Sequence, residues 1–192
     1  MKSKDVYSVI FKKETPAIEN CYPFLEWRNI WKTINSELIR VEERDFVYRY
    51  IYETLATNQR LNMLTLRSDA KCEKCNEVEF QLHVFYFCKE IKSVVNWFIS
   101  LLRKCCYLKE YNPLKLFFFD IKGKSSKDRN TAIALITCYL YSLWLGRKHS
   151  NNVNELFMLL KRRLEWQRSM LRGRYTNKIH LYVTKEYLNF IL

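Results

Sequence analysis

The sequence predicts a mainly α-helical fold, with bundled helical lobes around a short cysteine-rich segment. Only three glycines and three prolines occur among the 192 residues. The chain therefore lacks the breakers that the many tight turns of a β-sandwich or barrel require. Apolar residues recur at helical spacing along most of the chain, as expected for amphipathic helices. Because 48% of the residues are hydrophobic and 16% are aromatic, the chain can also form a sizeable core.

The first half is expected to contain three helices after a connector at residues 1–23. The first two helices each carry an apolar stripe at helical spacing. Thr57 is expected to cap a third, short helix that carries Arg60, Leu61 and Leu64. The two stripes consist of Trp27, Ile30, Trp31 and Ile34, and of Val41, Phe46, Val47, Tyr50, Ile51 and Leu55.

The sequence of the second half predicts three further helices and one segment whose secondary structure is ambiguous. Residues 89–105 are expected to pack through Ile91, Val94, Val95, Phe98 and Leu102. Residues 114–120 are either a strand or a helical turn, because so short an apolar run fits both. Ser125 or Ser126 is expected to cap a long helix that ends at Gly146. A last helix is expected from about Val153 to Leu171. The faces predicted for these two long helices consist of Ile133, Ile136, Leu140, Leu143 and Trp144, and of Leu156, Phe157, Leu160, Leu164 and Met170.

One motif has the spacing of a metal site. Cys72, Cys75, His83 and Cys88 lie within 17 residues, and the first pair has the Cys-x2-Cys spacing that lets two thiolates bind one ion from a tight turn. Because four protein ligands fill a tetrahedral ion and leave no position for water, we expect a structural Zn²⁺ ion. We expect three parts: an N-terminal connector at residues 1–23, a zinc-binding domain at 24–104 that contains this motif, and a basic helical C-terminal region at 105–192.

The remaining cysteines do not fit this motif. We expect Cys21, Cys105, Cys106 and Cys138 to be buried core thiols, and His149 and His180 to be surface residues. The first residues have no apolar segment of signal-peptide length, and no run of 18 apolar residues occurs. We therefore expect an intracellular protein, in the nucleus or the cytoplasm, that makes no membrane contact.

The charge of the chain indicates a polyanionic partner. Its formal net charge is +13, and residues 147–192 alone carry 10 basic and 3 acidic residues, a net charge of +7. A basic surface binds phosphates through a salt-dependent term, so we expect RNA or DNA to bind without sequence specificity. The expected contacts are Lys71, Lys74, Tyr86, Lys89, Arg147, Lys148, Lys161, Arg162, Arg163, Arg168, Arg172 and Arg174.

The order of these features resembles one family. Residues 24–100 are similar to the zinc-binding domain that follows the reverse transcriptase in non-LTR retrotransposon polyproteins. The matching segments are WRNIWK at 27–32, RDFVYRYI at 44–51 and ATNQRL at 56–61, followed by the Cys-Cys-His-Cys cluster and Trp97. The resemblance implies that the chain binds template RNA or target DNA and that a reverse transcriptase domain is a partner. No polymerase motif occurs in this sequence.

Two alternatives remain open beside a non-catalytic nucleic-acid-binding module. Asp120 and Lys122 have the Asp-x-Lys spacing of metal-dependent nucleases, but such a site needs further carboxylates, and no convincing second acid is found. The second alternative is a zinc-stabilised protein-interaction module, in which an exposed tryptophan would anchor a partner. We expect no enzymatic activity.

Overall fold

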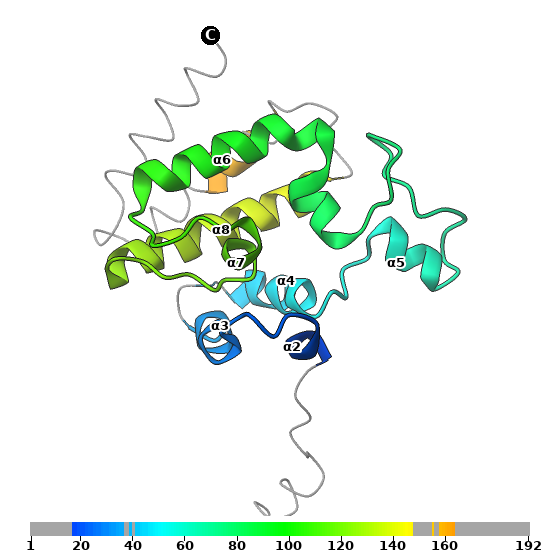
Figure 1. The fold of residues 1–192 in the computed structure, drawn as a ribbon. Coiled ribbons are helices and arrows are strands. Elements are labelled where there is room, and N and C mark those ends of the chain that lie inside the picture. The colour runs from blue at the N-terminus through cyan, green and yellow to red at the C-terminus, as the bar shows by residue number, and fades with distance from the viewer. Residues whose placement is uncertain (1–16, 37–38, 40, 148–154, 156–157, 164–192) are drawn as a thin grey trace, which may run out of the picture.

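The computed structural model describes residues 17–36, 39, 41–147, 155 and 158–163, and these residues form a mainly helical structure (Figure 1). Their only β-type pairings are the isolated bridges Lys71–Val78 and Leu108–Gly123. The predicted mainly α fold is confirmed. The elements are α2 (Ala17–Cys21), α3 (Trp27–Ile34), α4 (Val41–Ile51), α5 (Asn58–Met63), the π-helix η1 (His83–Phe87), the 3₁₀ helix η2 (Lys89–Ile91), α6 (Lys92–Cys105), α7 (Pro113–Phe117) and α8 (Ser126–Gly146).

Helix α8 is the centre of the fold. It contacts α4, α6 and η1 (Figure 1). The predicted face of α8 is buried apart from the half-buried Trp144, but Leu135 and Tyr139 are buried as well. A helix that is apolar on most of its circumference is covered by neighbours on several sides. The prediction of a single buried face was therefore too narrow.

The ends of α5 and α8 follow the predicted capping residues. The Thr57 hydroxyl accepts a hydrogen bond from the backbone N–H of Arg60 at 3.3 Å, and α5 begins at Asn58, directly after Thr57. The Ser125 hydroxyl accepts one from the N–H of Asp128 at 3.1 Å, and α8 ends at Gly146 as predicted. Because a capping side chain satisfies a donor that the helix cannot, these residues fix where the helices start.

The predicted stripes of α3 and α4 are largely confirmed. Ile30, Ile34 and Tyr50 are fully buried, but Val41 is 76% exposed. Val41 precedes Tyr50 by nine residues, about two and a half helical turns, so the two side chains lie on opposite sides of α4. The prediction that Val41 joins the core was wrong for this reason.

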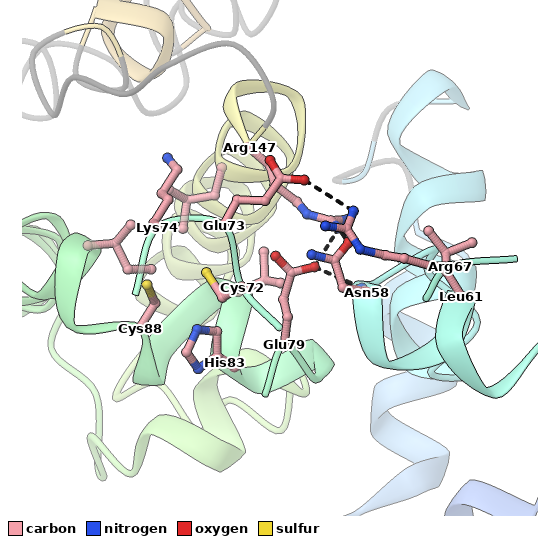
Figure 2. A pocket seen from close by; sticks show the side chains of 13 residues that line it. Asn58, Leu61, Arg67, Cys72, Glu73, Lys74, Glu79, His83, Cys88 and Arg147 are labelled. Carbon is pink, nitrogen blue, oxygen red and sulfur yellow. Dashed lines mark hydrogen bonds and ion pairs between the residues drawn. The ribbon is translucent and has the colours of Figure 1, made fainter. Parts of the chain in front are cut away.

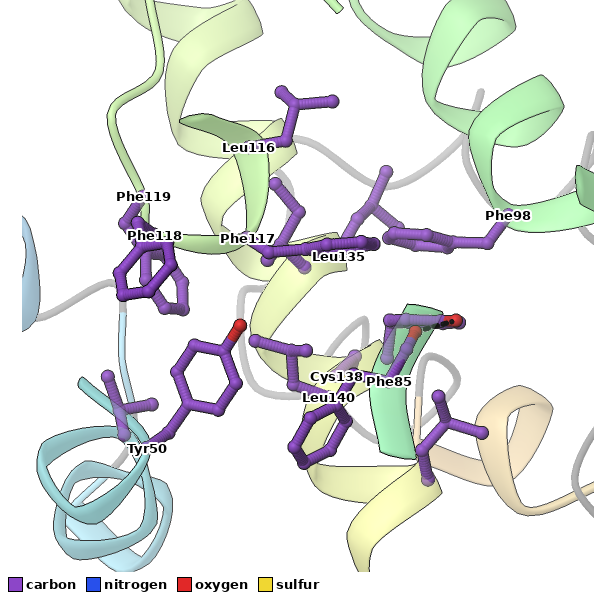
Figure 3. Packing of buried hydrophobic residues seen from close by; sticks show 14 of the residues in the cluster. Tyr50, Phe85, Phe98, Leu116, Phe117, Phe118, Phe119, Leu135, Cys138 and Leu140 are labelled. Atoms are coloured by element: carbon purple, nitrogen blue, oxygen red, sulfur yellow. Dashed lines mark hydrogen bonds between the residues drawn. The ribbon is translucent and has the colours of Figure 1, made fainter. Parts of the chain in front are cut away.

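Aromatic rings fill the core between α6, α7 and α8 (Figure 3). The rings of Phe98 and Tyr139 are stacked with centroids 4.0 Å apart, and Phe117 stacks on Tyr139 at 5.8 Å. The Tyr139 hydroxyl donates to the backbone carbonyl of Phe85 in η1 at 2.9 Å. The ambiguous segment 114–120 begins as the helical turn α7, which ends at Phe117, and the buried Phe118 and Phe119 follow it in a turn.

One continuous core joins the parts of the chain that the sequence divides at residue 104. It contains buried residues from Ile18 to Leu160. Within the predicted connector, residues 17–21 form α2, and residues 1–16 lie outside the described part. Of the predicted last helix, residues 155 and 158–163 are described and helical, with Leu160 buried.

Candidate metal centre

The first two candidate ligands sit in a tight turn. The N–H of Cys72 donates to the carbonyl of Glu77 at 2.7 Å, and the N–H of Asn76 donates to the carbonyl of Cys72 at 2.9 Å. Asn76 has a φ of 65°, in the left-handed region that asparagine tolerates better than most residues. The bridge between Lys71 and Val78 closes the base of the turn. This turn holds Cys72 and Cys75 close together.

The other two ligands are brought together by the π-helix η1. The N–H of Cys88 donates to the carbonyl of His83, five residues earlier, at 3.0 Å. This is the hydrogen bond that defines a π-turn, which often occurs at functional sites. The five-residue separation of the two ligands therefore equals the span of one π-helical hydrogen bond.

All four ligand residues are buried and converge. Their candidate ligand atoms lie within 4.8 Å of one another, and Cys75 Sγ is 3.3 Å from His83 Nε2. The residues are 3–7% exposed. A tetrahedral ion bound by thiolates and imidazole places its ligand atoms about 3.5–3.8 Å apart. The ligand atoms therefore need to move by only about 1 Å or less to fit around a metal ion of that geometry, and the cluster can hold one.

Burial sets the protonation of this cluster in the absence of a cation. It raises the pKa of Cys88 to about 12, with the nearby Cys72 and Cys75 adding to the rise, and it raises the pKa of Cys72 as well. Burial lowers the pKa of His83, which favours the neutral imidazole that ligates metals. An ion that binds here must displace thiol protons, so its affinity depends on pH.

The ion pair between Arg147 and Glu79, which we call the clamp, joins the knuckle, defined here as residues 71–88, to the end of α8 (Figure 2). Arg147 donates to the buried carboxylate of Glu79 and to the side-chain oxygen of Asn58, at 2.5 and 3.0 Å. The same Glu79 oxygen accepts a hydrogen bond from the backbone N–H of Asn58 at 2.8 Å. The side-chain amide of Asn58 donates to the backbone carbonyl of Lys71 at 2.7 Å. Sequence reasoning missed Glu79 and Asn58, because nothing in the local pattern pairs residues so far apart.

Arg147 is also one of the predicted nucleic-acid contacts. Its side chain is only 11% exposed. A third hydrogen bond, at 2.9 Å, joins it to the carbonyl of Ala56, and its guanidinium lies 4.9 Å from the ring centroid of Trp144. Its donors are thus directed at groups of the protein.

A cavity of about 90 Å³ lies beside the cluster (Figure 2). It is bordered by three of the four ligands, Cys72, His83 and Cys88, and by the charged residues of the clamp. The other lining residues are Asn58, Leu61, Arg67, Glu73, Lys74, Glu79, Val84, Ile91, Leu143 and Arg147.

The predicted contacts near the knuckle surround an open hollow of mixed charge. Lys71 and Lys89 are exposed, and Lys74 is half-buried. Arg67 joins them but pairs with Glu73 at 3.1 Å. The acids Asp69, Glu73 and Glu90 line the same hollow. Tyr86, the predicted stacking residue, is half-buried.

The predicted contacts of the tail are described only in part. Arg162 is exposed and Lys161 is half-buried. Arg163 pairs with the fully buried Glu43 at 3.0 Å, and its guanidinium lies 3.9 Å from the ring centroid of Tyr141. Arg163 thereby joins the described segment 158–163 to α4 and α8. Lys148, Arg168, Arg172 and Arg174 lie outside the described residues, as do His149 and His180.

The cysteines outside the cluster differ in exposure. Cys106 and Cys138 are buried, as predicted. Cys21 is exposed, so its assignment to the core was wrong. Cys105 is half-buried and packs against the core, so that prediction is confirmed only in part. Cys21 is the last residue of α2, at the edge of the fold, where fewer elements cover it.

The Asp-x-Lys pair lies apart from the metal cluster. Asp120 is buried and accepts the backbone N–H of Glu26 at 3.4 Å. Lys122 forms an ion pair with the Glu26 carboxylate. Within the described ranges, the Cys₃His cluster is the only group of three or more His, Cys, Asp or Glu side chains that could hold a metal ion. A carboxylate site for metal-dependent cleavage is therefore not assembled among these residues.

Comparison with models of known protein families, with curated protein sequences and with solved structures finds no match. In the part of the chain that the structure describes, no helix is long and apolar enough to cross a membrane.

Proposed function

We propose that this chain is a non-catalytic nucleic-acid-binding module whose fold is stabilised by one Zn²⁺ ion. The observation that carries the proposal is the convergence of four buried ligand atoms within 4.8 Å. Because Cys72, Cys75, His83 and Cys88 would fill all four positions of a tetrahedral ion, no water is left to activate. The ion would then be structural.

The ligand set favours zinc over other divalent ions. Three thiolates and one imidazole are soft ligands in a tetrahedral arrangement, which suits Zn²⁺ and not the oxygen-binding Mg²⁺ or Ca²⁺. The four ligands come from only two short segments, residues 72–75 and 83–88. Binding of the ion would therefore contribute directly to the stability of the knuckle.

Two observations support nucleic acid as the partner. The net charge of +13 favours a polyanion, which a basic protein binds by releasing counterions. The resemblance of residues 24–100 to the zinc-binding domain of non-LTR retrotransposons points to RNA template or target DNA. It also makes a reverse transcriptase domain a candidate partner.

A protein-interaction module is the second candidate function. Three apolar side chains near the end of α5 support it, because Met63, Leu64 and Leu66 are 77%, 53% and 72% exposed. Exposed apolar groups that lie together are typical of protein-binding surfaces. Such binding would depend little on salt.

Binding of the metal-loaded full chain to labelled single-stranded RNA and DNA, at several salt concentrations, tests the proposal. We expect binding whose affinity falls steeply with salt, and no cleavage of either strand when Mg²⁺ is added. Absence of binding at low salt would contradict the proposed partner. Mg²⁺-dependent cleavage, lost in the variant Asp120→Asn, would support the nuclease alternative instead.

A further inference from the structure

We propose that single-stranded nucleic acid binds along the solvent-facing side of α6 and the loop that follows it. This inference rests on the proposed function and names the surface that performs it. We call this surface the α6 stripe, and it comprises Tyr86, Lys89, Lys92, Asn96, Arg103, Tyr107, Lys109 and Lys124.

Buried and exposed side chains recur at helical spacing along α6, so the helix has a core-facing side and a solvent-facing side. Val94, Phe98 and Leu101 are buried against the core. Lys92, Asn96 and Arg103 are exposed, and their spacings of four and seven residues place them on one face of a helix. The charged end groups of Lys92 and Arg103 therefore line the same outer face, near the two ends of the helix.

The stripe carries more cations than acids, although Asp128 accepts the backbone N–H of Tyr107 at 3.2 Å. Residues 86–109 contain five basic residues and one acid, Glu90. Lys89, Lys92, Arg103, Lys109 and Lys124 are exposed. None of the five stripe cations, which include Lys124 but not Lys104, forms an ion pair with a described residue. Arg147 and Arg163, in contrast, each bind a buried carboxylate. The α6 stripe therefore offers cations that phosphates can reach without breaking internal pairs.

A short backbone ladder gathers the remaining cations at the C-terminal end of α6. The N–H of Lys109 donates to the carbonyl of Lys122, and the N–H of Lys124 donates to the carbonyl of Tyr107, both at 2.8 Å. Gly123 lies between them, where a Cβ atom would come within 2.7 Å of the backbone nitrogen of Arg129. Only glycine fits there, and this close packing holds the loop against the first turn of α8, while the two backbone hydrogen bonds join it to the segment that follows α6.

Each end of the stripe places one tyrosine ring beside a lysine, the exposed Tyr107 and the half-buried Tyr86. Tyr107 is 68% exposed, and the Lys124 ammonium lies 5.9 Å from its ring centroid. The Lys92 ammonium lies 5.8 Å from the ring centroid of Tyr86 at the other end of α6. Exposed rings beside a basic track stack the bases of single strands, at roughly 1–3 kcal/mol per base. Paired bases in a duplex offer no such faces, so the rings favour a single strand.

A pair of charge reversals tests the location. The variant Lys92→Glu/Arg103→Glu alters the α6 stripe, and Arg28→Glu/Lys32→Glu is its matched control on α3. The control removes one exposed cation near each end of a helix and changes the net charge equally. Helix α3 packs against α4 and lies away from α6 (Figure 1). All four side chains are exposed, and circular dichroism checks that both variants are folded.

The assay is fluorescence anisotropy of labelled single-stranded RNA, single-stranded DNA and duplex DNA with each metal-loaded full chain. We expect the α6 variant to bind single strands at least tenfold more weakly at 0.1 M salt. Its log–log salt slope should fall by about 1.4, two contacts at about 0.7 each. The α3 variant should lose less than threefold. Tyr107→Leu should also weaken single-strand binding, whereas Phe24→Leu, at a ring that is 55% exposed, should not.

Each other outcome overturns the inference. Equal losses in the two charge variants would show that binding follows overall charge, and an unchanged α6 variant would place the site elsewhere. Duplex binding as tight as single-strand binding, with no effect of Tyr107→Leu, would exclude base stacking. In these cases the proposed function survives. A wild-type chain that binds none of the three probes overturns the proposed function together with the inference.

Discussion

The guanidinium of Arg147 binds the buried carboxylate of Glu79, a residue 68 positions earlier in the chain. Arg147 follows directly on α8, and Glu79 lies in the knuckle, four residues before the ligand His83. The hydrogen bonds of Arg147 to Asn58 and Ala56 add the start of α5 to the same contact. The end of the central helix is therefore joined to the segment that carries the metal ligands.

Replacing Arg147 by methionine should destabilise the fold markedly. Both side chains of the pair are nearly buried, at 11% and 6% exposed, so the variant leaves a buried carboxylate without its counter-charge. Breaking one side of such a pair costs about 3–5 kcal/mol. Urea unfolding of the metal-loaded protein measures this loss.

The double variant Glu79→Gln/Arg147→Met is the control for that experiment. Because it removes the stranded charge, it should recover part of the stability lost in Arg147→Met. A loss below about 0.5 kcal/mol for Arg147→Met, the range of ordinary surface substitutions, would contradict the role of the clamp.

Replacement by phenylalanine should change the free energy of unfolding differently at two tyrosines of the core. The hydroxyl of Tyr139 donates to the carbonyl of Phe85, so Tyr139→Phe should cost about 1–2 kcal/mol. The hydroxyl of Tyr50 is buried and has no hydrogen-bond partner among the described residues. Tyr50→Phe should therefore be neutral or stabilising. Equal losses in thermal or urea unfolding would refute this difference.

Alkylation with iodoacetamide at pH 8 should separate the cysteines by environment. Cys21 is exposed and should react first. Burial raises the pKa of Cys105 to about 11, and burial raises that of Cys106 still further. At pH 8 both remain protonated, and the thiol is the unreactive form. Mass spectrometry should find one rapid modification in the metal-loaded chain. Additional ones should follow at Cys72, Cys75 and Cys88 after chelation, because loss of the ion unfolds the knuckle and exposes these thiols to solvent. Rapid modification of those three before chelation would argue against a bound ion.

Metal binding should release protons near pH 7. The pKa of Cys88 is raised to about 12 and that of Cys72 is also raised, mainly by burial, so both thiols are protonated in the metal-free fold. His83 has a lowered pKa and binds as the neutral ring, so it releases no proton. Calorimetry in buffers of different ionisation enthalpy should report at least two protons per ion, and an affinity that rises with pH. Binding that is independent of pH would contradict thiolate ligation.

Local patterns in the sequence predicted much of this fold. The side chains of Thr57 and Ser125 and the glycine at 146 act within a few residues of their own position, and α5 and α8 begin or end where they indicate. The spacing of the four ligands likewise predicted a cluster, and these residues converge. Capping and short-range ligand spacing are properties of a single segment, so they can be read from it.

Features that depend on tertiary packing were not predictable in this way. The pair formed by Arg163 and Glu43 joins residues 120 positions apart, and no local pattern identifies such partners. Arg147 and Arg163 belong to a basic C-terminal region that suggests a solvent-facing contact surface, yet each binds a buried carboxylate. The π-helix at His83–Phe87 was equally hidden, because its hydrogen bond differs from that of an α-helix by one residue.

The metal content of the purified chain tests the central claim most directly. Elemental analysis should be run on the wild type, on Cys75→Ser and on Cys106→Ala, which alters a buried cysteine outside the cluster. We predict one zinc per chain in the wild type and in Cys106→Ala, and a loss of zinc together with loss of knuckle structure in Cys75→Ser. A wild-type chain that is folded, binds no added zinc and matches Cys75→Ser in stability would contradict the account.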